Sequence, residues 1–521
     1  MLILTTSKGW AISSFDYTSK TALISSPLNA AYLLAENGGD GGDGGDGEGA
    51  GSEDGENSAE MDGEENGEEN GEEDGEEDGE NSAEMDAITA EMTASYSETE
   101  NSSRERVAGN LQTGTWDQAL NELENTWEQD LQAFYGSDTS VRNISLGQLQ
   151  QTLGSLDQQT GQKSAIVYLA SRQDSLEVLL VTADAAPARH SIPEAKREVL
   201  FKTAGQLLTQ ISHQGRTIGL AYLTPAKQIY QWIMAPIVPQ LDRQKINNLI
   251  FVSDYGLRSI PMGVLHDGQQ FLIEKYSISN SPGFSLIDPK FKSIRNSPVL
   301  AMGASTFTNQ NPLPAVPVEL NLITQNLGGG LSFLNQPFTI KNLISQRQQQ
   351  PFEIVHLATH ADFNSGSPDR SYIQFFDGQL LLRDLSQLGL NDPPVQLLVI
   401  SACQSAVGNK NAELGFAGLA VKSGVDTVVA SLWYVSDEGT LALMNEFYRH
   451  LRTAPIKAEA LRQAQIAMIK GNIQIENGQL VTNQANSQTR IPLPPELANL
   501  NLSNLSHPYY WSAFTMIGSP W

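Results

Sequence analysis

Three apolar runs dominate the C-terminal half of this sequence: FEIVHLATH at 352–360, VQLLVISAC at 395–403 and DTVVASLW at 426–433. Each run is short and nearly free of polar residues, which is typical of a strand buried on both faces of a sheet. Similar runs occur upstream at 247–254 and 298–305, and helical patterns separate them. Apolar strands that alternate with helices predict an α/β fold, with a mostly parallel central sheet flanked by helices.

Two of these runs end on reactive side chains, His360 and Cys403. Because the carboxyl ends of neighbouring parallel strands lie at the same end of a sheet, we expect the imidazole and the thiol to meet there. A nearby imidazole can take the proton of a nucleophilic thiol and later protonate a leaving amine. The alternative is that the lone cysteine is inert packing and that the histidine is a hydrogen-bonded core residue.

The net charge of −28 over 521 residues comes from one segment. Residues 36–100 hold 26 acidic residues and no Lys or Arg, whereas the remaining 34 acids and 32 bases nearly balance. The overall charge argues against a generic nucleic-acid partner. Repeats such as GEEN and GEED, with abundant Gly and few apolar residues, predict a disordered acidic linker over 36–103. A solvated spacer is favoured over a specific calcium site, although weak cation binding by the linker is expected.

Other parts of the chain carry weaker patterns. Residues 1–35 are predicted to be a short β-type segment, and residues 104–159 a helical lead-in with a helix at 115–135. HPYYW at 507–511 is expected to belong to the last strand, with its rings packed on the sheet. No apolar run reaches about 18 residues and no secretory signal is evident, so we expect no membrane segment. A single cysteine fits a reducing compartment, and we expect a cytoplasmic protein.

The blocks HLATHA and LLVISACQSAVG resemble the CHAT domain family, one of the caspase-like cysteine peptidases together with separase. Further blocks at 252–279, 415–440 and 507–518 are similar to the same family and occur in the expected order. The resemblance covers about residues 160–521. It implies a caspase-like layered fold, with the catalytic part at about 298–521.

The resemblance also implies roles for individual residues. Cys403 would be the nucleophile, and His360 the general base and acid. The backbone N–H groups of Cys403 and Ala361 would form the oxyanion hole. The family has Gly where this chain has Ala361, and Ala is unfavourable there if the backbone φ must be positive.

Three further residues are candidates for the site. Asp437 resembles the acid that receives an Arg before the cleaved bond in separase, and Trp433 is a candidate to line the same pocket. Alternatively, Ser436 caps a helix that Asp437 begins, and Trp433 is a core residue. His356 is either a second residue that orients His360 or a buried structural histidine, since an even offset on a strand places both on one side. No cofactor or metal site is expected.

The function that we infer from the sequence is that of a cysteine endopeptidase, with a preference for Arg or Lys before the cleaved bond as a hypothesis. The alternative is a scaffold or signalling module of the same fold with little or no turnover. The expected partners are a protein substrate and a regulatory protein, with neither nucleic acid nor membrane.

Overall fold

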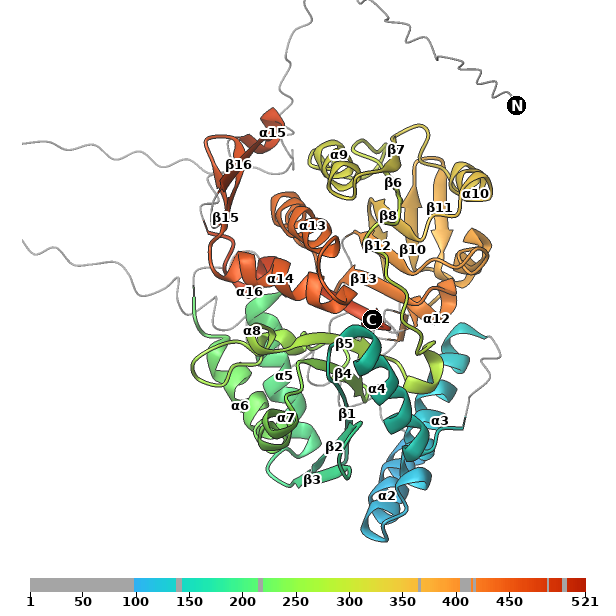
Figure 1. Ribbon diagram of the computed structural model, residues 1–521, viewed down its shortest axis with the longest axis vertical. Helices are drawn as coiled ribbons and strands as arrows, with labels where there is room; N and C mark the ends of the chain where they lie inside the picture. The colour runs from blue at the N-terminus through green and yellow to red at the C-terminus, as the bar shows by residue number, and fades with distance from the viewer. Residues whose placement is uncertain are drawn as a thin grey trace, which may run out of the picture. The chain divides into compact units, whose positions relative to one another are not determined.

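The computed structural model describes residues 98–136, 143–213, 219–363, 367–402, 414–415, 418–484, 487–498 and 504–521 (Figure 1). The predicted segment 1–35 and most of the predicted linker 36–103 lie outside these ranges. Helix α2 (Glu98–Gln112) begins within the last residues assigned to that linker, so the helical lead-in starts before residue 104. These residues are held by tertiary contacts, because the Ser103 hydroxyl donates a 2.9 Å hydrogen bond to Glu122.

One large sheet forms the centre of the described chain (Figure 1). In spatial order its strands are β3 (Ala188–Ile192), β2 (Leu176–Thr182), β1 (Ser164–Ser171), β4 (Asn248–Ser253), β5 (Ser277–Ser281), β17 (Phe514–Gly518), β13 (Thr427–Ser431), β12 (Leu397–Ser401), β8 (Ile354–Ala358), β6 (Val299–Gly303) and β7 (Gly330–Leu334). Neighbouring strands are parallel, except in the pairs β3–β2, β2–β1 and β17–β13. The predicted α/β fold with a mostly parallel sheet is confirmed.

The antiparallel pair β17–β13 divides the sheet into two parallel groups that run in opposite directions. Strands β1, β4 and β5 therefore have their carboxyl ends at one end of the sheet. Strands β13, β12, β8, β6 and β7 have theirs at the other. The strands that lead to His360 and Cys403 belong to the second group.

Helices cover the sheet, which is why its central strands are buried on both faces. Figure 1 shows α9 and α13 on one side of β6, β8 and β12, and α10 on the other. The α-helices with printed bounds after α2 are α3 (Trp116–Tyr135), α4 (Leu146–Thr160), α5 (Arg197–Ile211), α6 (Leu223–Ile233), α7 (Val238–Gln244), α8 (Leu272–Lys275), α9 (Val316–Asn326), α10 (Ile340–Gln349), α12 (Leu419–Ser423), α13 (Asp437–Leu451), α14 (Lys457–Ile469), α15 (Pro495–Ala498) and α16 (Pro508–Trp511).

Two small antiparallel sheets flank the large one. The first consists of β11 (Gly378–Leu381), β10 (Tyr372–Phe375) and β9 (Ala361–Asp362), and it follows directly after β8 and His360. The second consists of β14 (Ile473–Glu476), β15 (Gln479–Gln484) and β16 (Ser487–Pro492). The first of these sheets brings a hairpin beside the candidate site.

The lead-in helices α2 and α3 share the core of the large sheet. Asp254, the residue after β4, forms a buried ion pair with Arg104 of α2 and accepts a 3.2 Å hydrogen bond from Trp127 of α3. Burial is the largest influence and raises the pKa of Asp254. The charge and hydrogen bonds of Arg104, the charge of Arg258 and the Trp127 hydrogen bond together outweigh it, so the net pKa is lowered. The helix predicted at 115–135 is observed as α3, and its apolar face packs into the core.

The segment HPYYW is a helical turn, so the prediction of a strand there is wrong. Pro508 begins α16, and the His507 ring accepts a 3.2 Å hydrogen bond from the Tyr509 backbone N–H. Proline fits the first position of a helix because its φ is already helical and its missing N–H has no partner there. The rings of this turn are buried as expected, but the last strand is β17.

Within the described ranges, no helix is both long enough and apolar enough to cross a bilayer.

Candidate functional site

Strands β8 and β12 are parallel neighbours whose last residues, Ala358 and Ser401, lie opposite each other. The pairing continues one step further, because the Thr359 backbone N–H donates a 3.1 Å hydrogen bond to the Ser401 carbonyl oxygen. His360 is two residues beyond Ala358, and Cys403 is two residues beyond Ser401 in the sequence. The expected adjacency of the two strands is confirmed. Cys403 itself lies outside the described residues, so its pairing with His360 stays a prediction.

The imidazole of His360 is held by a backbone carbonyl group. Its Nε2 lies 2.8 Å from the carbonyl oxygen of Asn311, in the loop between β6 and α9. Since a carbonyl oxygen only accepts, this hydrogen bond requires a hydrogen on Nε2. In the neutral ring Nδ1 is then unprotonated and able to accept a proton.

The same loop and the small sheet fix the rest of His360. The Phe307 ring lies with its centroid 4.6 Å from that of the imidazole, at an interplanar angle of 59°. The His360 carbonyl oxygen accepts a 2.9 Å hydrogen bond from the Gln374 backbone N–H of β10. The Thr359 hydroxyl donates to the Gln374 carbonyl oxygen at 2.7 Å. The ring and backbone of His360 are thus constrained from two sides.

Ala361 begins β9, at the edge of the small sheet. Ala361 lies opposite Ile373. The preceding pair, His360 and Gln374, is hydrogen-bonded, because the Gln374 N–H donates to the His360 carbonyl oxygen. Since hydrogen-bonded and non-hydrogen-bonded pairs alternate along antiparallel strands, the pair of Ala361 and Ile373 is not hydrogen-bonded. The Ala361 N–H therefore points away from β10, toward the open edge. Its φ is not positive, so Ala in place of the family's Gly introduces no backbone strain at this position.

His356 lies in a buried polar network beneath the strand ends. Its Nδ1 is 3.1 Å from the Tyr448 hydroxyl of α13. Its Nε2 is 3.2 Å from Oε1 of Glu319 in α9, although the N–H is not aligned well enough for a hydrogen bond. Glu319 Oε1 also accepts a 2.8 Å hydrogen bond from the Ser401 hydroxyl of β12. His356 of β8 therefore contacts α13 and α9. The imidazole of His360 is oriented by Asn311 and not by His356.

Asp437 begins α13, and Ser436 caps that helix by accepting a hydrogen bond from the Gly439 N–H at 3.3 Å. The Asp437 carboxyl group also accepts a 3.2 Å hydrogen bond from the Ala315 backbone N–H, at the end of the loop that carries Asn311. Burial, with smaller contributions from the charges of Glu319 and Glu438, raises the pKa of Asp437 to about 7. The helix-start alternative is observed, and the same carboxyl group also lies against the loop that supports His360.

Trp433 is buried in the core. Its side chain is 3% exposed, and its indole N–H donates a 3.3 Å hydrogen bond to the Tyr509 carbonyl oxygen. The core alternative for Trp433 is therefore the one observed.

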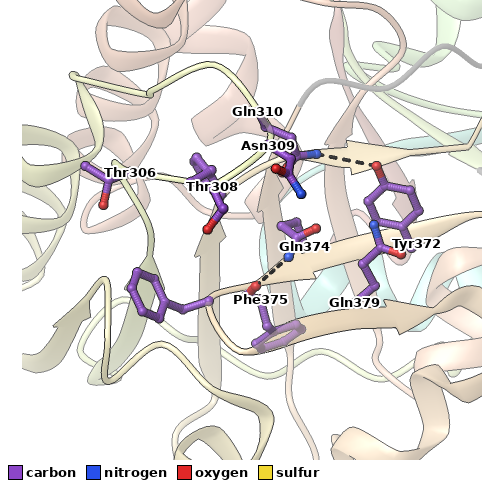
Figure 2. A pocket seen from close by; sticks show the side chains of 10 residues that line it. Thr306, Thr308, Asn309, Gln310, Tyr372, Gln374, Phe375 and Gln379 are labelled. Carbon is purple, nitrogen blue, oxygen red and sulfur yellow. Dashed lines mark hydrogen bonds between the residues drawn. The ribbon is translucent and has the colours of Figure 1, made fainter.

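A cavity of about 570 Å³ is lined in part by Phe307, whose ring packs on that of His360. Figure 2 shows the side chains that line the cavity. Its walls are formed by the loop after β6 and by strands β10 and β11. The lining residues are Thr306, Phe307, Thr308, Asn309, Gln310, Tyr372, Gln374, Phe375, Phe376 and Gln379. Of the suggested site residues that the structure describes, none contributes to the lining.

Two supporting residues were not anticipated from the sequence. Asn311 acts through its backbone carbonyl group, which leaves no side-chain signal in a sequence. Glu319 lies on the buried face of an otherwise ordinary amphipathic helix, and only the tertiary structure places its carboxyl group between Ser401 and His356.

The CHAT domain family model matches residues 223–519, which is more than half of this chain. No curated protein matches the sequence. Two crystal structures of the Saccharomyces cerevisiae separase–securin complex are similar to the chain, with TM-scores of 0.39 and 0.38 at 11% and 9% sequence identity. In both comparisons the matched region covers 78% of this chain and 34% of the yeast chain. This chain therefore spans about a third of the length of the yeast chain.

Proposed function

The chain belongs to the CHAT domain family, and from this premise we propose that it is a cysteine endopeptidase that cleaves protein substrates through Cys403 and His360. One observation carries the proposal. His360 follows the strand that is in register with the one leading to Cys403, and the Asn311 carbonyl group orients its imidazole. The proposal adds that Cys403 completes the pair.

In the proposed reaction, His360 Nδ1 takes the proton of the Cys403 thiol, and the thiolate attacks the substrate carbonyl carbon. The N–H groups of Ala361 and Cys403 donate to the oxygen that gains negative charge. The C–N bond then breaks, and the imidazolium gives its proton to the leaving amine. Water, deprotonated by the imidazole, attacks the thioester, the C–S bond breaks, and the thiolate regains a proton.

The position of Ala361 supports the oxyanion role. Its N–H points to the open edge of the small sheet, directly after His360. Because this N–H makes no hydrogen bond to the neighbouring strand β10, no bond within the protein has to break when the N–H binds the oxyanion.

We further propose that Asp437 receives an Arg or Lys side chain before the cleaved bond. Its carboxyl group is mostly buried, close to Glu319 and Glu438, and burial is the main reason that its pKa is about 7. The described residues supply no cation that pairs with it. A bound guanidinium would provide that missing positive charge and favour the ionised carboxylate.

The test uses the full chain and fluorogenic peptides that differ in the residue before the cleaved bond, with and without calcium. We expect Cys403→Ala and His360→Ala each to lower turnover at least about a hundredfold. The exposed His213 provides the matched control, since His213→Ala should leave turnover unchanged. If wild type and Cys403→Ala behave alike under every condition, the chain is instead the inactive scaffold that forms the alternative.

The assignment of Asp437 has its own test. Asp437→Asn should lower turnover of peptides with Arg before the bond about tenfold or more, and should affect peptides with an uncharged residue there far less. An unchanged preference would leave Asp437 with a structural role alone.

The proposal also includes a regulatory protein partner, a cytoplasmic location and weak cation binding by the acidic residues 36–103. Binding to this segment would weaken as salt rises, because screening shortens the range of its charges. A shortened chain that lacks residues 36–97, compared with the full chain in a calcium titration, tests the cation binding.

A further inference from the structure

The loop after β6, which lines the cavity, belongs to a strand on the side of β8 away from the strand that leads to Cys403. In the sheet, β8 separates β12 from β6. His360 follows β8, and the cavity is formed by the loop after β6 together with the hairpin β10–β11. The Phe307 wall of the cavity contacts the His360 ring.

This position corresponds to the leaving group of the proposed reaction. A thiolate attacks the carbonyl carbon, while the imidazolium protonates the amine that departs. The nitrogen of the cleaved bond must therefore lie beside the imidazole. The substrate residue that carries this nitrogen, and those after it, lead from His360 toward the loop after β6.

The described residues that line the cavity are polar and uncharged. None of these ten residues is Asp, Glu, Lys, Arg or His. Amides and hydroxyls supply hydrogen-bonding groups, as in the 3.4 Å contact from the Gln310 amide to the Tyr372 hydroxyl (Figure 2). Phe307 and Phe376 supply apolar surface, whereas the Phe375 side chain is fully buried and packs on Phe338. The volume is within the roughly 300–1,000 Å³ of ordinary ligand sites.

A charged side chain would enter this cavity at a cost. It would lose water without gaining an opposite charge, and such burial is unfavourable. The carboxylate of Asp362, opposite Tyr372 at the margin, would add repulsion for an acidic side chain. An uncharged side chain with a donor or acceptor at its tip would instead find hydrogen-bonding partners and aromatic contact.

We propose that this cavity binds the substrate residue directly after the cleaved bond, and that it selects an uncharged polar or aromatic side chain such as Gln or Tyr. This inference rests on the proposed function, because the direction of the substrate follows from the Cys403 and His360 roles. It assigns specificity to the leaving side of the bond, separate from the Asp437 assignment.

A binding experiment tests the inference without turnover. The full chain with Cys403→Ala is titrated with fluorescein-labelled octapeptides that carry Arg before the bond and Gln, Tyr, Lys or Glu after it. We expect the Gln and Tyr peptides to bind about tenfold more tightly than the Lys peptide, with the Glu peptide weakest. Equal dissociation constants for the four peptides, or no measurable binding of any, would overturn the inference. If the peptides bind in the expected order but wild type shows no Cys403-dependent cleavage, the proposed function fails and the selectivity of the cavity stands as a binding property.

A charge placed in the cavity provides the second measurement. Gln379 is an exposed residue of β11 in the lining, so Gln379→Glu should fold normally. We expect it to strengthen binding of the Lys peptide about tenfold relative to the Gln peptide. The matched control is Gln348→Glu, the same charge change at an exposed position of α10 outside the cavity, which should leave the order of affinities unchanged. An identical effect of both variants would contradict the assignment.

Discussion

The Ser401 hydroxyl donates a 2.8 Å hydrogen bond to Glu319, so a helix carboxyl group holds β12 two residues before Cys403. Both side chains are buried, and Glu319 also faces His356 of β8. This single carboxyl group therefore connects the two strands whose carboxyl ends make the candidate site.

Ser401→Ala should lower the free energy of unfolding by about 1–3 kcal/mol, because it leaves a buried Glu319 oxygen without its donor. Urea unfolding followed by circular dichroism measures the change. Ser386, an exposed serine, provides the control, since Ser386→Ala should change stability by less than about 0.5 kcal/mol. Equal effects of the two variants would show that the hydrogen bond contributes nothing.

Asp437 should make stability depend on pH. Its pKa is raised from 3.8 to about 7 in the folded chain, so the protonated form is favoured by folding. Between these values the folded state binds more protons than the unfolded state, and stability falls as pH rises toward 7. The folded chain is therefore most stable, with respect to this group, below about pH 4, where Asp437 is protonated in both states. Ionisation of Asp437 at higher pH lowers the free energy of unfolding by at most about 4 kcal/mol in total.

Asp437→Asn mimics the neutral carboxyl group and should remove this dependence. We expect its melting temperature, relative to wild type, to rise between pH 4.5 and about pH 7 and to level off by pH 8. Asp377, an exposed acid, is the control, and Asp377→Asn should stay parallel to wild type over the same range. A constant difference between wild type and Asp437→Asn would contradict the raised pKa.

Arg104→Met should destabilise the chain strongly. It leaves the fully buried Asp254 without its cation, and breaking a buried pair from one side typically costs about 3–5 kcal/mol. Arg106 offers a matched comparison two residues away, because it is 56% exposed in its ion pair with Glu122. Arg106→Met should cost less than about 1 kcal/mol. Thermal unfolding of both variants distinguishes the two kinds of pair.

Gly303 ends β6 where no side chain fits. An added Cβ would meet the Ala358 carbonyl oxygen and the Val316 side chain at distances that real Cβ atoms do not reach. Gly303→Ala should therefore push β6 away from β8 and cost about 1–3 kcal/mol. It should also lower any Cys403-dependent turnover, because the loop after β6 carries the Asn311 carbonyl group. Gly329→Ala, which has open space and no positive φ, should change neither property.

The central strands and their mostly parallel pairing could be predicted from the sequence because these strands are buried on both faces. The antiparallel pair β17–β13, which reverses the direction of half of the sheet, was not predicted. Apolar runs such as 354–358 and 397–401 are stable only where both faces of the strand are covered by other parts of the protein. The helical patterns between such runs favour parallel pairing of the strands, with the helices as crossover connections. The segment HPYYW was read wrongly for the same reason. Its rings are buried, but burial alone does not distinguish a strand from a helical turn, and Pro508 was the signal for the turn.

The supporting groups of the site could not be predicted. Asn311 contributes a carbonyl oxygen that every residue possesses, and its position depends on a loop between β6 and α9. Glu319 and Asp437 lie on different helices, and only the packing of α9 against α13 brings their charges close. The uncharged lining of the cavity likewise comes from two segments about 60 residues apart in the sequence.

The ion pair between Arg104 and Asp254 has a consequence for how this protein is divided into parts. The family match begins at residue 223, yet strand β1 lies between β2 and β4 of the same sheet, and α2 contributes a buried charge to it. A fragment cut at the start of the match would expose the edge of β4 and leave Asp254 unpaired. The part that the family model matches is therefore smaller than the part that must be kept together for the molecule to fold. Any shortened version intended for expression should start upstream of Glu98.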